Sequence, residues 1–156
     1  MGINNFLFFY IQLKNYKVKS RMLTRETDSY NIEIMEIGTI RSRFSVPTDP
    51  IEMKKHQSVI IIHKDYEQGL YRIEENKYLQ ILFNLHLSRG YELIDSTYDG
   101  MKKGIFASRS SRRPSALGLT KVKLLKRDGR ILKVIGLDAL DGSPVFDIKP
   151  YSDIMD

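Results

Sequence analysis

An alternating segment that reverses direction at Asp128-Gly129 limits the fold of this chain more than any other part of it. Before the reversal, Val122 and Leu124 alternate with lysines, so a strand here carries its apolar side chains on one face. After it, residues 131–135 repeat the apolar pattern. Asp-Gly between two such runs favours a tight turn, because both residues tolerate the positive φ angles that the turn needs. The segment predicts an antiparallel β-hairpin.

Short β-strand patterns recur along the rest of the chain. The turn-forming residues 47–50 end the first of them, and residues 141–144 form a second turn signal. Only residues 67–76 have the spacing of a short helix. We expect strands over residues 32–42, 59–62, 78–87, 91–94 and 145–148, and loops over 95–103 and 106–118. Several short strands with almost no helix predict a mainly β fold, a closed or nearly closed β-barrel.

The length of 156 residues suits one domain with a real core. We predict an N-terminal extension over residues 1–30, with Met22 as an alternative start, and a barrel domain over residues 31–156. The apolar run at residues 6–11 is too short to span a bilayer, and no basic residue precedes it as in a signal peptide. We therefore expect no membrane association, no export and a cytoplasmic location.

The composition excludes several chemistries. There is no cysteine, so thiolate zinc sites, iron–sulfur clusters and disulfides are ruled out. The three histidines lack the spacing of a metal site, and we expect no metal. No Walker loop, GxGxxG, HExxH or Ser/His/Asp signature occurs, so nucleotide hydrolysis, dinucleotide redox chemistry and zinc proteolysis have no support.

Positive charge is concentrated in one segment. The formal net charge is +6, and residues 101–133 hold eleven Lys or Arg against one acidic residue, Asp128. Such a cluster favours a polyanionic partner. The loop over residues 106–118 contains three arginines, serines and a proline, which suits a loop that presents guanidinium and backbone N–H groups to an anion. A solvated basic loop explains the same residues equally well.

Three carboxylates and one histidine have two interpretations each. Asp138, Asp141 and Asp147 recur near a turn and a strand end. Asp141 can instead open the turn, and Asp147 can pair with Lys149. His86 lies in an apolar strand pattern, where a hydrogen-bonded core histidine is more common than a catalytic one.

Three motifs resemble the TsaA-like (TrmO) family of S-adenosylmethionine-dependent tRNA methyltransferases. Residues 37–42 (IGTIRS) are similar to its opening IGxIRS, and residues 104–118 (GIFASRSSRRPSALG) to its GxFATRSxxRPNPIG. Residues 138–151 (DALDGSPVFDIKPY) are similar to its DxxDGTPVxDIKPY. The last motif is long and ordered, and the similarity runs from about Glu36 to the C-terminus.

The resemblance implies a single-sheeted antiparallel β-barrel that binds S-adenosylmethionine, usually works as a homodimer and methylates N6 of N6-threonylcarbamoyladenosine at position 37 of tRNA. Carried over residue by residue, it implies donor contacts at Asp49, Pro50, Ile51, His86, Arg109, Leu119, Ile135, Gly136, Leu137 and Asp138. Leu119 and Leu137 can sandwich the adenine, and Asp138 can take a ribose hydroxyl or the amine. The catalytic candidates are Arg109, Asp138 and His86. The residues expected to bind tRNA are Lys102, Lys103, Arg112, Arg113, Lys121, Lys149 and Tyr151.

The chain departs from the family pattern around the expected pocket. Ser115-Ala116-Leu117 replaces Asn-Pro-Ile, Ser108 replaces a threonine, Asp49 replaces a glutamine and Tyr78 replaces a histidine. An Arg-Pro segment usual before residue 104 is not recognisable. Two further hypotheses therefore stay open. One is a methyltransferase that acts on a small molecule, and the other is a non-catalytic protein that binds S-adenosylmethionine or RNA.

Overall fold

The structure, a computed structural model, describes residues 33–96 and 100–154. The chain divides into two compact units, Met1–Met35 and Glu36–Asp156, and every strand described belongs to the second. The extension predicted over residues 1–30 lies outside the described residues. The predicted start of the barrel domain at residue 31 stays a prediction.

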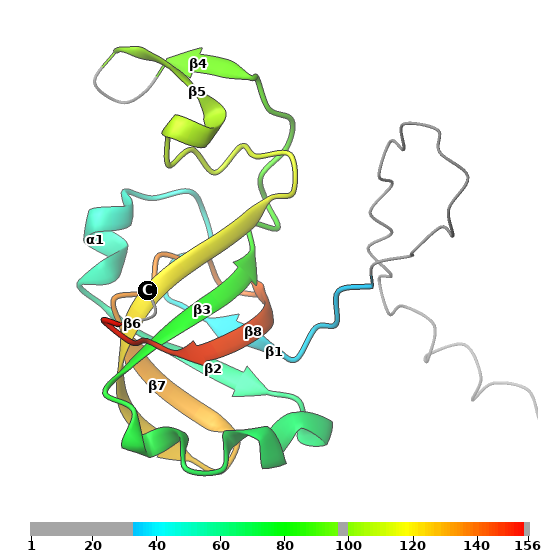
Figure 1. Ribbon diagram of the computed structural model, residues 1–156, viewed down its shortest axis with the longest axis vertical. Coiled ribbons are helices and arrows are strands. Elements are labelled where there is room, and N and C mark those ends of the chain that lie inside the picture. Colours follow the sequence, from blue (N-terminus) through cyan, green and yellow to red (C-terminus); the bar gives the residue numbers. More distant parts are fainter. Residues whose placement is uncertain (1–32, 97–99, 155–156) are drawn as a thin grey trace, which may run out of the picture. The chain divides into compact units, whose positions relative to one another are not determined.

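Six strands close into a barrel in which every pairing is antiparallel (Figure 1). In order around the barrel they are β1 (Gly38–Arg41), β2 (Gln57–Ile62), β7 (Ile131–Ile135), β6 (Leu117–Asp128), β3 (Tyr78–Asn84) and β8 (Pro144–Pro150). Closure pairs both sides of each strand, so no long edge stays open to another chain. The predicted mainly β, single-sheeted antiparallel barrel is confirmed.

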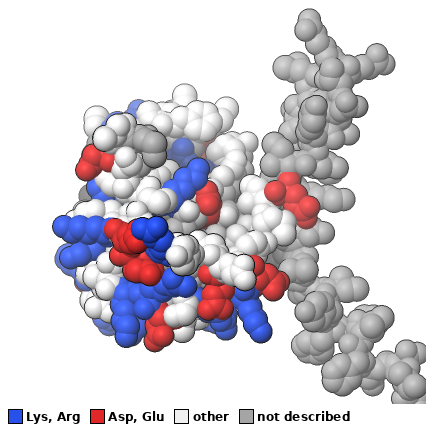
Figure 2. All heavy atoms as spheres, turned by 60° about the horizontal axis from the view of Figure 1, so that its bottom comes forward, with Lys and Arg blue, Asp and Glu red and all other residues white. Residues whose placement is uncertain are grey.

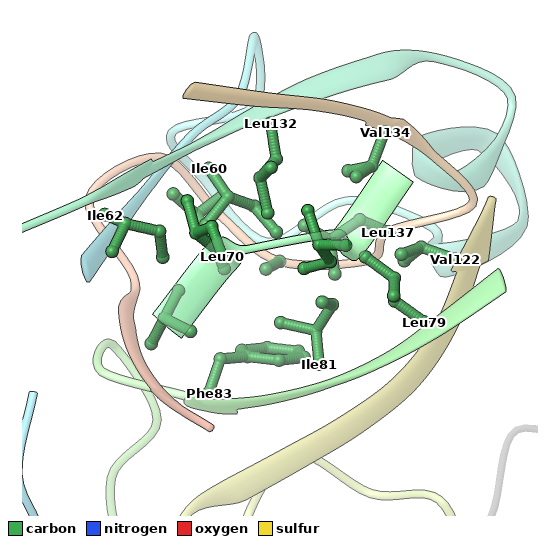
Figure 3. Packing of buried hydrophobic residues seen from close by; sticks show 14 residues of the cluster. Ile60, Ile62, Leu70, Leu79, Ile81, Phe83, Val122, Leu132, Val134 and Leu137 are labelled. Atoms are coloured by element: carbon green, nitrogen blue, oxygen red, sulfur yellow. The ribbon is translucent and has the colours of Figure 1, made fainter. Parts of the chain in front are cut away.

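The alternating residues of the strands fill the barrel interior. In β3 the buried positions are Leu79, Ile81 and Phe83, and the positions between them are at least partly exposed. Figure 3 shows these three side chains facing Ile60 and Leu132 across the core. Each fully buried aliphatic or aromatic side chain contributes about 1.5–3 kcal/mol. Packing inside the closed sheet therefore stabilises the fold.

The predicted hairpin is confirmed, but its turn is shifted by one residue. β6 ends at Asp128, which pairs with Ile131, so the two turn residues are Gly129 and Arg130. Gly129 has a φ of 56°, and no positive φ occurs at Asp128. Glycine at the first turn position is what a type II′ turn needs, and it adopts positive φ without a steric cost. The prediction that Asp128 supplies a positive φ is wrong.

Three helical segments differ from the sequence predictions. The turn-like residues 47–50 lead into an α-helix that the sequence analysis missed, α1 (Pro50–Lys54). The single helix predicted over residues 67–76 is two 3-10 helices, η1 (Lys64–Leu70) and η2 (Ile73–Glu75). They are separated at Arg72, whose φ of 64° is incompatible with a continuous helix. A third 3-10 helix, η3 (Ile105–Ala107), lies within the basic segment.

The segment after β3 also differs in detail. The predicted strand over residues 91–94 is instead β4 (Ile94–Ser96), and the predicted loop over 95–103 contains β5 (Lys102–Gly104). These two strands form a separate antiparallel pair. The first strand is shorter than predicted, since β1 begins at Gly38, and β3 ends at Asn84 before the predicted end at residue 87. The strands predicted at 59–62 and 145–148 are confirmed within β2 and β8.

Candidate functional site

One end of the barrel collects the segments that carry the motifs. β1 ends and β2 begins there, joined by residues 42–56. The antiparallel pairing of β3 with β6 and of β1 with β8 brings residues 85–116 and 136–143 to the same end. Backbone hydrogen bonds join these segments: the amide of Asp141 donates to the carbonyl of Phe44 at 2.7 Å, and that of Leu85 to Ala116 at 2.8 Å. The topology thus gathers the three motif regions in one place.

The helix α1 begins at the first predicted donor-binding residues. The carboxylate Oδ1 of Asp49 accepts a hydrogen bond from the amide of Ile51 at 2.9 Å, which caps the helix. Pro50 occupies the first turn, where its missing N–H costs nothing. The side chain of Ile51 is 71% exposed, so it is available to a ligand. The sequence therefore builds a short, capped helix with an apolar residue facing solvent.

Lys55 and His56 hold the exposed carboxylate of this helix. Glu52 Oε2 lies 2.7 Å from Lys55 Nζ, and Glu52 Oε1 lies 3.1 Å from His56 Nε2. The hydrogen bonds from Lys55 and His56 lower the pKa of Glu52 below its usual range. The hydrogen bond that Lys55 donates to Glu52 also raises the pKa of Lys55.

Two partners from other segments hold the side chain of Asp138, one of the catalytic candidates. Its Oδ1 accepts a hydrogen bond from the hydroxyl of Thr120 on β6, and Thr120 is only 5% exposed. Its Oδ2 lies 3.1 Å from Nζ of Lys54 on α1. The Asp138 side chain keeps 17% exposure, and a carboxylate offers about four lone-pair sites, so it can accept a further hydrogen bond. The sequence analysis missed both partners, because neither lies near Asp138 in sequence.

The residues before Asp138 have different positions. Gly136 has a φ of 101°. A Cβ added to it would lie 3.5 Å from the carbonyl oxygen of Lys121 and 3.7 Å from Cα of Val122. Leu137 is 1% exposed and packs in the core (Figure 3). Its side chain therefore cannot sandwich an adenine, and that part of the expectation is wrong. Leu119, by contrast, is 55% exposed. Ile135, half-buried, ends β7.

His86 and the basic loop form a second hydrogen-bonded group. The Nδ1 atom of His86 lies 3.1 Å from the hydroxyl oxygen of Ser143, which is 1% exposed. The hydroxyl of Ser88 donates to the carbonyl of Ser111 at 2.8 Å, which ties the segment after β3 to the loop. Ser143 of the last motif therefore orients His86, and Ser88, two residues after His86, is bonded to the basic loop.

The three loop arginines are not equivalent. Arg113 is half-buried, and its Nη1 donates to the carbonyls of Ile105 and Ser108 at 3.2 and 3.1 Å. It holds the loop in shape, so its expected role in binding tRNA phosphates is not the one its contacts favour. Arg109 and Arg112 are exposed. They present guanidinium groups that can bind a carboxylate or a phosphate.

Two carboxylates of the last motif have structural partners. Asp141 Oδ1 accepts from the amide of Ser42 at 3.0 Å, and Oδ2 lies 3.5 Å from Nη1 of Arg41, so Asp141 anchors the loop that follows β1. Asp147 lies 3.7 Å from Nζ of Lys149, as the pairing interpretation predicted. Neither residue belongs to the group around Asp138.

The other residues expected to bind tRNA lie on two surfaces. Lys102 and Lys103 are on β5, where Lys103 pairs with Asp95 in the strand register. Lys121, Lys149 and Tyr151 lie together at the outer face of β6 and β8. Lys121 Nζ is 3.3 Å from the centroid of the Tyr151 ring.

One open hollow lies away from these groups. It has a volume of about 700 Å³ and is lined by Lys64, Glu67, Gln68, Tyr71 and Arg127, none of which belongs to a motif. Figure 2 faces the end of the barrel with η1 and η2 and shows Lys and Arg interspersed with Asp and Glu. Ion pairs such as Arg127–Glu74 at 3.2 Å account for this mixture. An open hollow with balanced charge offers no convergent set of ligand groups.

Two features are absent from the described ranges, 33–96 and 100–154. No group of three or more His, Asp or Glu side chains there is placed to hold a metal ion. None of the helices in that part of the chain is both long enough and apolar enough to cross a membrane.

Side chains from several segments at this end of the barrel have the chemistry that S-adenosylmethionine needs. The donor carries a sulfonium and an amine, which need an anionic partner, and a carboxylate, which needs a cationic one. Asp138 offers the anion and the exposed Arg109 the cation. Ile51 offers exposed apolar surface for an adenine ring, whereas Leu119 lies on the outward face of β6, opposite to the buried Thr120. The expected catalytic grouping of Arg109, Asp138 and His86 stays a prediction.

Comparison with known proteins agrees with this arrangement. The family model for the tRNA-methyltransferase O N-terminal domain matches residues 38–156. A probable S-adenosyl-L-methionine-binding protein of Archaeoglobus fulgidus is 42% identical over 129 residues, covering 80% of this chain and 35% of that protein. The tRNA (adenine(37)-N6)-methyltransferase of Escherichia coli is 32% identical over 136 residues, covering 78% of this chain and 58% of the enzyme.

A solved structure of the same family is also similar to this chain. A crystal structure of TrmO from Pseudomonas aeruginosa superposes with a TM-score of 0.66 at 28% identity, over 81% of this chain and 59% of that one. The chain thus spans between about a third and three fifths of the length of these proteins. From Gly38 onward, the chain belongs to the tRNA-methyltransferase O N-terminal domain family.

Proposed function

We propose that the chain is an S-adenosylmethionine-dependent methyltransferase that methylates N6 of N6-threonylcarbamoyladenosine at position 37 of tRNA, in the cytoplasm. The observation that carries the proposal is the gathering of all three motif regions at one end of the barrel, around the oriented carboxylate of Asp138. The name of the E. coli relative, a tRNA (adenine(37)-N6)-methyltransferase, supports the choice of acceptor. The concentration of Lys and Arg in residues 101–133 supports an RNA substrate.

The residues around Asp138 hold the donor. When bound, S-adenosylmethionine supplies a methyl group from its sulfonium to an attacking nitrogen. Asp138 accepts a hydrogen bond from the ribose or the amine of the donor, while Thr120 and Lys54 fix the carboxylate. Arg109 binds the carboxylate of the donor. Fixed alignment of the two reactants supplies much of the rate in such a displacement, so residues that only orient them matter.

The acceptor nitrogen must also release a proton. The Nδ1 atom of His86 lies 3.1 Å from the hydroxyl oxygen of Ser143, which orients the ring at the last motif. We propose that His86 takes the proton, because histidine is the most common general base, and that Asp138 is the alternative acceptor.

The test is a reaction of the full chain with S-adenosylmethionine and tRNA that carries N6-threonylcarbamoyladenosine. We expect formation of S-adenosylhomocysteine and a mass increase on that nucleoside by one methyl group. The Arg109→Ala variant should lose turnover and stay folded. The proposal fails if the modified nucleoside never gains a methyl group while the donor still binds in calorimetry.

A second candidate function has one specific observation in its favour. Ala116 adopts a φ of 47°, which a proline in that position of the family motif cannot adopt. The loop that follows Arg113 therefore differs in backbone shape from the family pattern, and it lies beside His86 through the Leu85–Ala116 hydrogen bond. A methyltransferase for a small molecule would show activity that does not depend on salt and does not need tRNA.

We propose further that the chain forms a homodimer through the segment between β3 and the basic loop. Leu93, Ile94 and Phe106 are 66%, 68% and 78% exposed. Large apolar side chains gathered on one exposed segment mark an interaction surface. Sedimentation should show a dimer for the parent chain and a monomer for a Leu93→Ser and Phe106→Ser double variant. A monomeric parent chain would contradict this assembly.

A further inference from the structure

The outer face of β3, β6 and β8 carries a regular grid of side chains. These strands lie side by side on the barrel (Figure 1), and their register aligns the outward positions in rows. One row is Lys121, Gln80 and Lys149, and the next is Leu119, Leu82 and Asp147. A third pairs Tyr78 with Lys123, and Tyr151 follows the end of β8 beside them. We call this set of residues the sheet platform.

A small hollow lies in the middle of the sheet platform. It has a volume of about 190 Å³ and is lined by Gln80, Leu82, Leu119, Asp147 and Lys149. Pockets for whole drug-sized ligands have volumes of about 300–1,000 Å³, so this one suits a single planar ring. Leu119 and Leu82 supply apolar contact, while Gln80 and Asp147 supply hydrogen-bonding groups at the side.

The cations of the sheet platform are held close to this hollow. Lys121 Nζ lies 3.3 Å from the centroid of the Tyr151 ring and 4.8 Å from that of Tyr78. Two aromatic faces attract an ammonium group, so they restrict where this charge can lie. In the strand register Lys121 and Lys149 flank Gln80 on both sides. The one carboxylate among them, Asp147, lies 3.7 Å from Lys149 and leaves a positive balance.

We propose that the sheet platform binds a single-stranded segment of RNA. One base lies over Leu82 and Leu119 with its edge toward Gln80, and the neighbouring phosphates contact Lys121, Lys123 and Lys149. Single-stranded nucleic acids bind to protein surfaces that combine positive charge with flat or apolar surfaces for the bases. The carboxylate side chains of an acidic peptide would use the cations, but they have no ring to fill the hollow. This inference rests on the proposed function, since the segment is then part of the tRNA loop that presents the methyl acceptor.

The test removes two charges from the sheet platform and, as a matched control, two from the part of β6 and β7 that lies outside it. The platform variant is Lys123→Ala with Lys149→Ala. The control is Lys126→Ala with Lys133→Ala, a pair of exposed lysines that face each other across β6 and β7. Binding of a fluorescent tRNA anticodon stem-loop is measured by anisotropy at several salt concentrations. Unfolding in denaturant confirms that both variants fold.

We expect the platform variant to bind the RNA about tenfold more weakly at low salt. The slope of log K against log salt should become less steep by about 1.4, because each lost phosphate contact to a single strand removes about 0.7. The control should differ from the parent by less than about threefold. A second pair tests the hollow. Gln80→Glu, which adds a charge beside the base, should weaken binding, and Gln68→Glu on η1 should not.

Three results would overturn the inference. Equal RNA affinity of the platform and control variants would show that the sheet platform does not contact RNA. Weaker binding of S-adenosylmethionine by Gln80→Glu in calorimetry would assign the hollow to the adenine of the donor. A change of oligomeric state in the platform variant would assign the face to a second copy of the chain. If the parent binds RNA through the sheet platform but transfers no methyl group, the proposed function fails and this inference stands.

Discussion

The buried hydroxyl of Thr120 donates a hydrogen bond to Oδ1 of Asp138, so a side chain of β6 fixes the carboxylate that begins the last motif. Thr120→Val removes the donor and keeps the shape. We expect a loss of about 1–3 kcal/mol in the free energy of unfolding, because the bond is to a charged group. Affinity for S-adenosylmethionine should also fall. Thr120→Ser, which keeps the hydroxyl, should recover most of both in denaturant unfolding and calorimetry. Unchanged donor affinity in Thr120→Val would contradict the role of Asp138.

The two candidate acid–base residues should have different effects on binding and turnover. Asp138→Asn keeps the shape but loses the charge, so it should weaken donor binding by about ten- to a hundredfold, as expected for a hydrogen bond to a charged group worth about 1.5–3 kcal/mol. His86→Gln should leave donor binding near that of the parent and lower turnover by about a hundredfold or more, the usual contribution of a general base. Calorimetry and single-turnover kinetics measure the two quantities. Normal turnover in His86→Gln would assign the proton to another group.

Gly118 has no room for a side chain. A Cβ placed on it would lie 2.5 Å from Cζ of Phe83, whose ring is 1% exposed. We expect Gly118→Ala to destabilise the fold by about 1–3 kcal/mol, since the core must shift to accept one methyl group. In Phe83→Leu, which removes the obstructing ring, the same change should cost less. The coupling between the two substitutions in denaturant unfolding measures this, and additive effects would contradict the contact.

The strands could be predicted from the sequence, because burial of one face makes apolar residues recur at every second position. Val122 alternates with lysines, and the buried positions of β3 recur at every second residue. Gly129 marked the reversal to within one residue. The helix α1 was missed although Asp49, Pro50 and Glu52 are helix-start residues, because the same Pro and Asp also fit a turn.

The partners in the site could not be predicted in the same way. Lys54 and Thr120 contact Asp138 only because closure of the barrel brings α1, β6 and the last motif together. Burial of Leu137 was also hidden, since one leucine beside a glycine has no periodic context. The break at Arg72 has a left-handed conformation that its residue type does not favour. Family motifs located the region, and only the fold separates anchors such as Asp141 from residues that can face a ligand.

The Glu74–Arg127 pair predicts a pH dependence. Hydrogen bonds from its own backbone amide and then from Arg127 lower the pKa of Glu74 below the usual 4.5. A carboxyl group with a lowered folded-state pKa stabilises the fold above its unfolded pKa, and the stabilisation is lost as pH falls through the folded value. The stability difference between the parent and Glu74→Gln should therefore be constant at neutral pH and vanish in acid. Denaturant unfolding across this range measures it, and a difference that grows toward low pH would be inconsistent with the pair.

The backbone conformation of Ala116 predicts that a single substitution cannot restore the family motif. Its φ of 47° is positive, and its amide donates to the carbonyl of Arg113 at 3.2 Å. Ala116→Pro, which returns the residue usual in the family motif, forces φ to about −65° and removes that amide hydrogen. We expect it to destabilise the fold or shift the loop, because the carbonyl of Ala116 also accepts a hydrogen bond from Leu85 at 2.8 Å. Ala116→Gly, which adopts positive φ freely, should be at least as stable as the parent in denaturant unfolding. A stable, fully active Ala116→Pro variant would show that the loop adopts the family conformation instead.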